Sequence, residues 1–244
     1  MPQPLVNLLC LPCAGASATM YLRWRRELPA WVRVVTVELP GRGSRLSEPF
    51  AVDFASLVSG LCDEQAQAMA APYAVFGHSM GALLAHAIAV EQRRRDRRLP
   101  CALFAAGCAG PARFESRRFE LDDDAALIAD LRKQGGTPEE AFEHPELLRM
   151  ALDTLGRDYQ LCNAFRHAAT EPLPLPLHAL AGRSDDVELE RLRAWGRETS
   201  DVFTLDWFDG GHFFIREQQQ LLLERVVRHL SSHFTSGVSG SLNA

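Results

Sequence analysis

Short apolar runs alternate with segments of helical periodicity along most of this chain. Six runs are candidates for strands, and they lie at residues 6–11, 32–39, 74–76, 102–108, 177–182 and 203–208. Uninterrupted apolar runs are typical of parallel strands that are buried on both faces, and alternation of strands with helices is typical of a doubly wound sheet. We therefore expect a mostly parallel α/β sheet, with the functional site beyond the carboxyl ends of its strands.

The segments between these runs carry the periodicity of amphipathic helices. Over residues 53–69 apolar side chains recur at one-face spacing, and Asp53 is of a type that favours a helix N-cap. The last helix is expected over about 217–230. Residues 236–244 are rich in Ser and Gly and are expected to form a disordered tail. Residues 1–235 are then expected to form a single α/β domain.

One segment, from about residue 111 to residue 170, breaks the alternation because its periodicity is helical throughout. Three aspartates at 122–124 open one expected helix, Pro145 begins another, and Gly135-Gly136-Thr137-Pro138 forms a turn between them. A helical insertion between two strands can cover the strand ends, so we expect a lid over the site. Extra packing without a role at the site is the alternative.

Composition narrows the class of protein and of partner. A chain of 244 residues that is 47% apolar can bury one substantial core. A net charge of −5 and a pI near 5.9 give no electrostatic reason to expect nucleic acid or an anionic membrane as partner. The apolar runs are too short to span a membrane, and the N-terminus lacks the features of a signal peptide. We expect a monomeric cytoplasmic protein that needs no cofactor or metal.

The six cysteines lie mostly within apolar runs, which is typical of reduced, buried thiols rather than of a disulfide framework. Cys10 and Cys13 have the spacing of a redox pair. Coincidence is the favoured interpretation, because Cys10 lies inside a strand pattern.

The most informative motif is Gly77-His78-Ser79-Met80-Gly81, which follows the apolar run at 74–76 and precedes a run of small, helix-forming residues. Strand, sharp turn and helix in this order lift a serine hydroxyl out of the sheet on a strained backbone. An ordinary glycine-rich turn is the alternative. A serine hydroxyl is a weak nucleophile at neutral pH, so Ser79 needs a base, and the base needs an orienting carboxylate.

Candidates for both partners follow later in the chain. His212 stands in Gly210-Gly211-His212-Phe213-Phe214, where a flexible loop after the last strand can bring an imidazole over the strand ends. Asp185 and Asp186 follow the strand at 177–182, where the carboxylate is expected; spacing does not separate them, and either could instead cap a helix. His78 is expected to point away from Ser79.

Hydrolysis through a serine also needs two backbone N–H donors for the oxyanion of the tetrahedral intermediate. In this architecture the residue after the nucleophile, Met80, supplies one of them. The loop after the first central strand, residues 12–17, supplies the other, with Ala14 or a neighbour as the donor. A plain tight turn is the alternative for this loop.

Six motifs together resemble one family. In order along the chain they are Leu11-Pro12-Cys13-Ala14-Gly15, Leu39-Pro40-Gly41-Arg42-Gly43, Gly77-His78-Ser79-Met80-Gly81, Gly135-Gly136-Thr137-Pro138, Gly182-Arg183-Ser184-Asp185 and Gly210-Gly211-His212-Phe213-Phe214. Over nearly its whole length the chain resembles the type II thioesterases, the stand-alone editing enzymes of non-ribosomal peptide and polyketide synthesis, which have the α/β-hydrolase fold. Within that family it is similar to members of siderophore clusters such as that of pyochelin.

The resemblance implies a role for each candidate. Ser79 would be the nucleophile, His212 the base, Asp185 the acid aligned with the family's Gly-x-x-Asp, and Met80 and Ala14 the oxyanion donors. It also implies the substrate: acyl or aminoacyl groups held as thioesters on the phosphopantetheine arm of a carrier protein domain.

Two positions depart from the family pattern. Cys13 stands where an aromatic residue or histidine is usual, which would alter the pocket beside the oxyanion donors. Asp186 stands where proline is common, which keeps Asp186 as an alternative acid. Two other functions are considered beside the editing thioesterase: a small-molecule carboxylesterase with the same triad, and a non-catalytic protein that docks on synthases.

Overall fold

The computed structural model describes residues 6–115, 123–137, 139–168 and 171–238. Within them six strands form one sheet in the order β2-β1-β3-β4-β5-β6, and every neighbouring pair is parallel. The strands are β1 (Val6–Leu11), β2 (Val32–Thr36), β3 (Tyr73–His78), β4 (Leu103–Ala106), β5 (Leu177–Gly182) and β6 (Phe203–Phe208). The predicted parallel α/β sheet is therefore confirmed.

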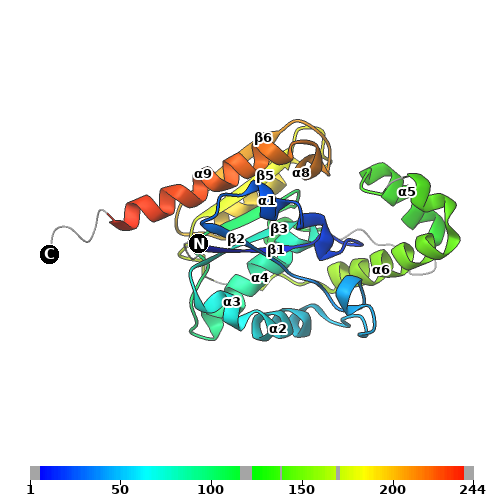
Figure 1. The fold of residues 1–244 in the computed structure, drawn as a ribbon, viewed down its shortest axis with the longest axis horizontal. Helices are drawn as coiled ribbons and strands as arrows, with labels where there is room; N and C mark the ends of the chain where they lie inside the picture. Colours follow the sequence, from blue (N-terminus) through cyan, green and yellow to red (C-terminus); the bar gives the residue numbers. More distant parts are fainter. Residues whose placement is uncertain (1–5, 116–122, 138, 169–170, 239–244) are drawn as a thin grey trace.

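Helices cover both faces of this sheet (Figure 1). On one face, α2 (Phe54–Glu64) and α4 (Met80–Arg94) bury their apolar sides against the strands. On the other face lie α1 (Trp24–Glu27), α8 (Phe214–Glu217) and α9 (Gln219–Val238). Each face has its own apolar core because successive side chains of a strand point to opposite faces.

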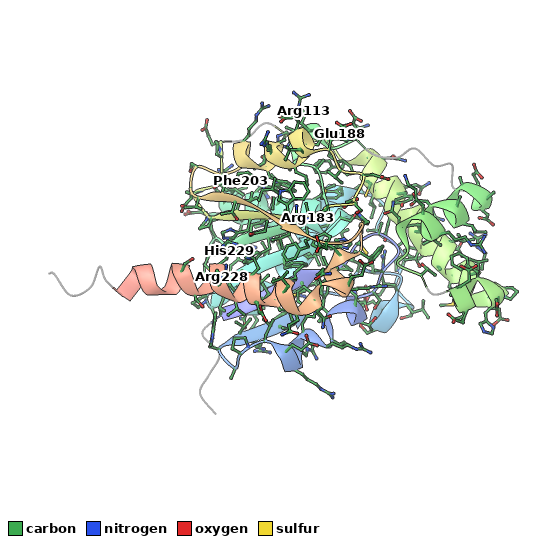
Figure 2. The ribbon with its side chains drawn as sticks, turned by 90° about the horizontal axis from the view of Figure 1, so that it is seen from above. Arg113, Arg183, Glu188, Phe203, Arg228 and His229 are labelled. Carbon is green, nitrogen blue, oxygen red and sulfur yellow. The ribbon has the colours of Figure 1, made fainter. Side chains whose placement is uncertain are left out.

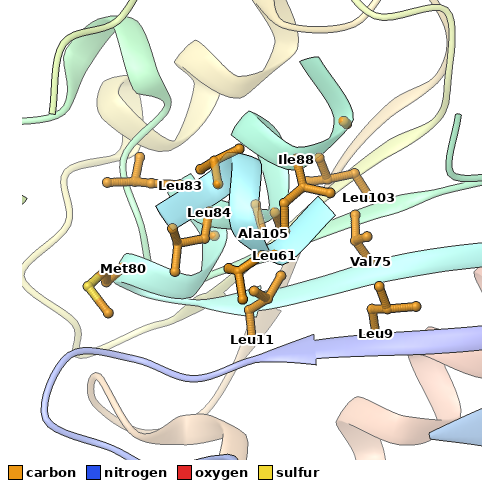
Figure 3. Packing of buried hydrophobic residues seen from close by; sticks show 14 of the residues in the cluster. Leu9, Leu11, Leu61, Val75, Met80, Leu83, Leu84, Ile88, Leu103 and Ala105 are labelled. Carbon is orange, nitrogen blue, oxygen red and sulfur yellow. The ribbon is translucent and has the colours of Figure 1, made fainter. Parts of the chain in front are cut away.

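Strand β3 shows this division. Val75 belongs to the core under α2 and α4, while Phe76 belongs to the core under α1 and α9. Figure 3 shows part of the first core, in which Ile88 of α4 lies near Leu103 of β4 and Val75 of β3. On the second face, His229 of α9 (labelled in Figure 2) stacks on His178 of β5, with 3.8 Å between the ring centroids.

The remaining helical elements are short, apart from those inserted between β4 and β5. They are η1 (Ala18–Tyr21), η2 (Gly43–Arg45), α3 (Ala66–Ala70), η3 (Pro111–Arg113), α5 (Asp124–Gln134), η4 (Glu139–Glu143), α6 (Pro145–Ala164), α7 (Leu189–Arg193) and η5 (Ala194–Arg197). The helix predicted over 53–69 is divided at Gln65 into α2 and α3.

The elements α5, η4 and α6 form what we call the inserted segment, residues 124–164. Figure 1 shows α5 and α6 beyond the end of the sheet. Asp123 caps α5 by accepting a hydrogen bond from the Ala126 N–H, and α5 ends at Gly135, which has a left-handed φ of 72°. The predicted start at Asp122 and the last residue of the predicted turn, Pro138, lie outside the described residues.

Helix α9 runs to Val238 and so extends past residue 236, where a disordered tail is predicted; residues 239–244 lie outside the described part of the chain. Among the described residues, none of the helices combines the length and apolar character needed to cross a bilayer.

Candidate active site

Ser79 occupies the turn that joins β3 to α4. Its backbone has φ 55° and ψ −117°, and its N–H donates to the Ala106 carbonyl at 2.8 Å, which ties the turn to the end of β4. A non-glycine residue at positive φ costs about 1–3 kcal/mol and persists only where the surroundings hold it. A Cβ atom at Gly77 would lie 1.9 Å from the Gly81 carbonyl oxygen, so glycine is required for helix and strand to meet so closely.

His212 lies in the loop between β6 and α8, and its ring contacts Asp185. The ring Nδ1 is 3.0 Å from Asp185 Oδ2 and 3.2 Å from Asp185 Oδ1, and the Asp185 side chain is 5% exposed. Asp186 instead forms an ion pair with Lys133 of α5 at 2.5 Å, and its side chain is 58% exposed. The geometry thus separates the two carboxylates, which the sequence leaves as alternatives.

Backbone contacts join the loop after β5, which carries Asp185 (the acid loop), to the loop between β6 and α8, which carries His212 (the histidine loop). The Arg183 N–H donates to the Phe208 carbonyl and the Ser184 N–H to the Gly210 carbonyl, both at 2.9 Å. A Cβ atom at Gly182 would lie 2.4 Å from the Gly211 carbonyl oxygen. The β5–β6 pairing therefore continues into the loops and holds Asp185 beside His212.

His78, which precedes Ser79, binds the backbone of the histidine loop. Its buried ring donates from Nε2 to the His212 carbonyl at 2.9 Å, and the two ring centroids are 4.8 Å apart. Burial, followed by the charge of His212, lowers the pKa of His78 well below its ordinary value, so the ring is neutral. The sequence predicts only that His78 points away from Ser79; its contact with His212 has no signal in the motif.

One pocket of about 280 Å³ lies at the carboxyl ends of the strands, and Ser79, Asp185 and His212 all line it. Met80 and Ala14 line it too. Among the described residues Ser79 makes no hydrogen bond to His212, and such bonds are often formed only when substrate is bound.

The two expected oxyanion donors are backbone N–H groups at this pocket. Met80 is the first residue of α4, and N–H groups in the first turn of a helix have no partner within it. Ala14 lies in the loop after β1, which is held by a hydrogen bond from the Ala16 N–H to the Cys13 carbonyl at 3.2 Å. Both residues line the same pocket as Ser79, and their roles as donors stay a prediction.

Residues of the inserted segment also line the pocket, and the segment contacts the histidine loop. The Arg216 guanidinium donates to the Gly136 carbonyl at 2.6 Å and lies 4.8 Å from the centroid of the Phe213 ring. A Cβ atom at Gly136 would lie 2.2 Å from the Phe213 ring, so only glycine allows this close approach. We call the contacts of Gly136 with Phe213 and Arg216 the loop contact; no sequence pattern predicts it.

Three cysteines, Cys13, Cys108 and Cys162, line the pocket as free thiols. Burial raises the pKa of Cys13 and of Cys108 to about 12, which keeps these thiols protonated at neutral pH. A protonated thiol, like a hydroxyl, is a poor nucleophile, so the choice of Ser79 rests on its strained strand-to-helix turn rather than on the acidity of its hydroxyl. Within the described part of the chain, no group of three or more His, Cys, Asp or Glu side chains could hold a metal ion.

A pocket at the carboxyl ends of a parallel sheet, with a serine on a strained strand-to-helix turn, defines a protein of the α/β-hydrolase fold. A family model described as thioesterase domain matches residues 6–234, and the chain belongs to this family of hydrolases.

Three similar proteins illustrate the relationship. Thioesterase PikA5 of Streptomyces venezuelae is 34% identical over 238 residues, which cover 94% of this chain and 82% of PikA5. The structure of the type II thioesterase BorB from the borrelidin biosynthetic cluster is 36% identical, covers 94% of both chains and has a TM-score of 0.84. That of ClbQ from the colibactin NRPS/PKS pathway is 28% identical, covers 95% of this chain and 99% of ClbQ and has a TM-score of 0.88. The predicted resemblance to type II thioesterases is confirmed, whereas the pyochelin-type member is not.

Proposed function

We propose that this chain is a stand-alone editing thioesterase, which hydrolyses stalled or aberrant acyl and aminoacyl thioesters from the phosphopantetheine arm of carrier protein domains. The observation that carries the proposal is the meeting of Ser79, His212 and Asp185 at one pocket. Membership in the thioesterase family and similarity to type II enzymes of peptide and polyketide pathways support the thioester as substrate.

In this mechanism the Ser79 hydroxyl attacks the thioester carbonyl while His212 Nε2 accepts its proton. Asp185, which accepts a hydrogen bond from His212 Nδ1, orients the ring and stabilises the imidazolium. The N–H groups of Met80 and Ala14 hold the oxyanion. His212 then returns the proton to the departing sulfur, which leaves the acyl group on Ser79. Water, activated by His212, releases the acid and restores the enzyme.

The thioester also suits the pocket chemically. A thiolate leaves readily, so the reaction depends less on His212 as general acid than hydrolysis of an ester or an amide would.

We propose that the inserted segment acts as the lid of this site, since it lines the pocket through α5 and α6. Carrier protein domains would be the partners, and the phosphopantetheine arm belongs to them, so the enzyme itself needs no cofactor. A siderophore pathway is proposed from the sequence resemblance alone.

The test compares Ser79→Ala with Ser47→Ala, which changes an exposed loop serine. Several carrier proteins are loaded with acetyl or aminoacyl groups, and release is followed by mass spectrometry. Wild type and Ser47→Ala are expected to release the acyl group and Ser79→Ala to release none. Undiminished release by Ser79→Ala would refute the triad.

Two further measurements separate the alternatives. Faster turnover of soluble esters than of carrier-bound acyl groups would favour a small-molecule carboxylesterase. Failure of a fluorophosphonate to label Ser79 would favour a non-catalytic docking protein.

A further inference from the structure

The buried ion pair between Arg42 and Asp158 lies outside the pocket but touches the loop that carries Ala14. Arg42 Nη1 is 2.5 Å from Asp158 Oδ2, and Arg42 Nη2 is 2.6 Å from Asp158 Oδ1, so the contact is bidentate. The Asp158 side chain is fully buried, and that of Arg42 is 6% exposed. Asp158 lies on α6 of the inserted segment, and Arg42 follows β2.

Both side chains also bind the backbone of the loop after β1. The Gly15 N–H donates to Asp158 Oδ2 at 2.8 Å, and Arg42 Nη1 donates to the Ala16 carbonyl at 3.3 Å. Gly15 has a left-handed φ of 73°, and a Cβ atom there would lie 3.2 Å from Leu155, one turn before Asp158 on α6. The ion pair therefore holds the peptide groups on the C-terminal side of Ala14.

Stability alone is a weak explanation for this pair. Desolvation of two charges offsets much of their attraction, and an apolar pair of similar volume is often as stable. Arg42 Nε is buried without a partner among the described residues, which adds to the cost. An apolar pair, however, could neither accept a hydrogen bond from the Gly15 N–H nor donate one to the Ala16 carbonyl.

We propose that Arg42 and Asp158 are positioning residues for the oxyanion site: they fix the loop at residues 14–16 so that the Ala14 N–H points at the oxyanion. This rests on the proposed role of Ala14. Because Asp158 belongs to the inserted segment, the same pair couples that segment to the oxyanion site. Displacing a group by about 1 Å can lower a rate by about a hundredfold.

The test uses Asp158→Asn, which keeps the shape of the side chain and removes its charge. Asp153→Asn is the matched control: it makes the same change on the same helix, in an exposed ion pair with Arg149. Asp158→Asn is expected to lower kcat about ten- to a hundredfold with KM changed less than about threefold. Asp153→Asn is expected to leave both constants unchanged.

Arg42→Lys is the second variant, because it keeps the charge and fold but loses the bidentate contact. It is expected to lower kcat in the same way. A trifluoromethyl ketone, which forms a tetrahedral adduct with Ser79, should bind each variant more weakly by the factor lost in kcat/KM. A purely structural role would lower the unfolding temperature and leave this affinity unchanged in the folded protein.

Either of two results overturns the inference: wild-type kcat in a folded variant, or a loss of rate that only matches the loss of folded protein. All variants are measured on acetyl-carrier protein and on p-nitrophenyl acetate. If wild type hydrolyses only the soluble ester, the proposed function fails, and the positioning role is still decided on that ester.

Discussion

Gly81 and Gly60 both lie within helices, but their surroundings differ. A Cβ atom at Gly81 would lie 2.3 Å from the Leu11 carbonyl oxygen and 2.7 Å from that of Pro12, whereas at Gly60 nothing lies within 4 Å. Backbone atoms cannot move aside as a flexible side chain can. Gly81 is therefore where α4 meets the end of β1, just before the loop that carries Ala14.

We predict opposite effects of the same substitution at these two glycines. Gly81→Ala should lower the free energy of unfolding by about 1–3 kcal/mol, because the backbone must shift. Gly60→Ala should raise it by about 0.5–1 kcal/mol through helix propensity and loss of unfolded-state entropy. Urea unfolding followed by circular dichroism measures both. Equal effects of the same sign would contradict the contact at Gly81.

His78 predicts a pH dependence of stability. Its folded pKa is lowered well below the ordinary value of 6.5, mainly by burial. As the pH falls below about 6.5 the unfolded chain therefore binds a proton that the folded protein does not, and stability decreases. The decrease reaches at most about 1.4 kcal/mol per pH unit from this group.

His78→Gln removes this titration and keeps an N–H donor that can reach the His212 carbonyl. The stability of the variant relative to wild type is expected to improve as the pH falls from 7 to 5, with no change in the difference between pH 7 and 8. Urea titrations at each pH measure it. Parallel stability curves for the two proteins would show that His78 does not stay neutral.

At the scale of elements, the inserted segment and the histidine loop meet at the loop contact. Its hydrogen bond from Arg216 to the Gly136 carbonyl joins the turn after α5 to the residues that follow His212. The ion pair of Lys133 with Asp186 is a second link between α5 and the catalytic loops. These links are few compared with the packing of the sheet, so α5 should open more readily than the sheet.

We predict that Arg216→Met increases hydrogen exchange in residues 124–137 and leaves exchange in the sheet unchanged. The substitution keeps an apolar side chain beside Phe213 but removes the donor to Gly136. Arg183→Met is the control, because the only contact of the Arg183 side chain among the described residues is an exposed ion pair with Asp209 near the same loops. Mass spectrometry of peptides after exchange gives the readout. If both variants exchange alike, the loop contact does not hold α5.

Element boundaries show where sequence patterns reach their limit. The strands predicted at 6–11, 177–182 and 203–208 match β1, β5 and β6, because a residue that interrupts the apolar run follows each of them: Pro12, Arg183 and Asp209. In the run at 32–39, pairing with β1 ends at Thr36, although Val37 and Leu39 beyond it are buried. Burial beneath loops produces the same apolar pattern as a strand, so the pattern extends past the end of the sheet.

The candidate site also has features that the sequence predicts and features that it does not. The local motif around Ser79 predicts its turn, because the strain and the close approach involve neighbours in sequence. Asp185 and Asp186 differ only in the direction in which their loop presents them, which no spacing records. Arg42 and Asp158 lie 116 residues apart and meet only because α6 returns to the end of the sheet. Their pairing becomes visible only in three dimensions.

At the scale of the whole molecule, the two cores on opposite faces of the sheet have different relations to the site. Ser79 directly precedes α4, which packs in one core, while Phe214 and Ile215, just after His212, pack in the other. Helix α9 closes this second core through Leu222, Val226 and Leu230. Stability supplied by α9 far from the pocket should therefore be separable from the chemistry.

Leu222 and its neighbour Leu221 give a matched test of this separation. Leu222 is fully buried, whereas Leu221 is 43% exposed. Leu222→Ala is expected to lower the free energy of unfolding by about 2–5 kcal/mol through lost burial and a cavity, and Leu221→Ala by less than about 0.5 kcal/mol. Urea unfolding measures both. The rate per active site, counted by fluorophosphonate titration, should equal that of wild type in each. A lower rate per titrated site in Leu222→Ala would show that the second core also sets the position of His212.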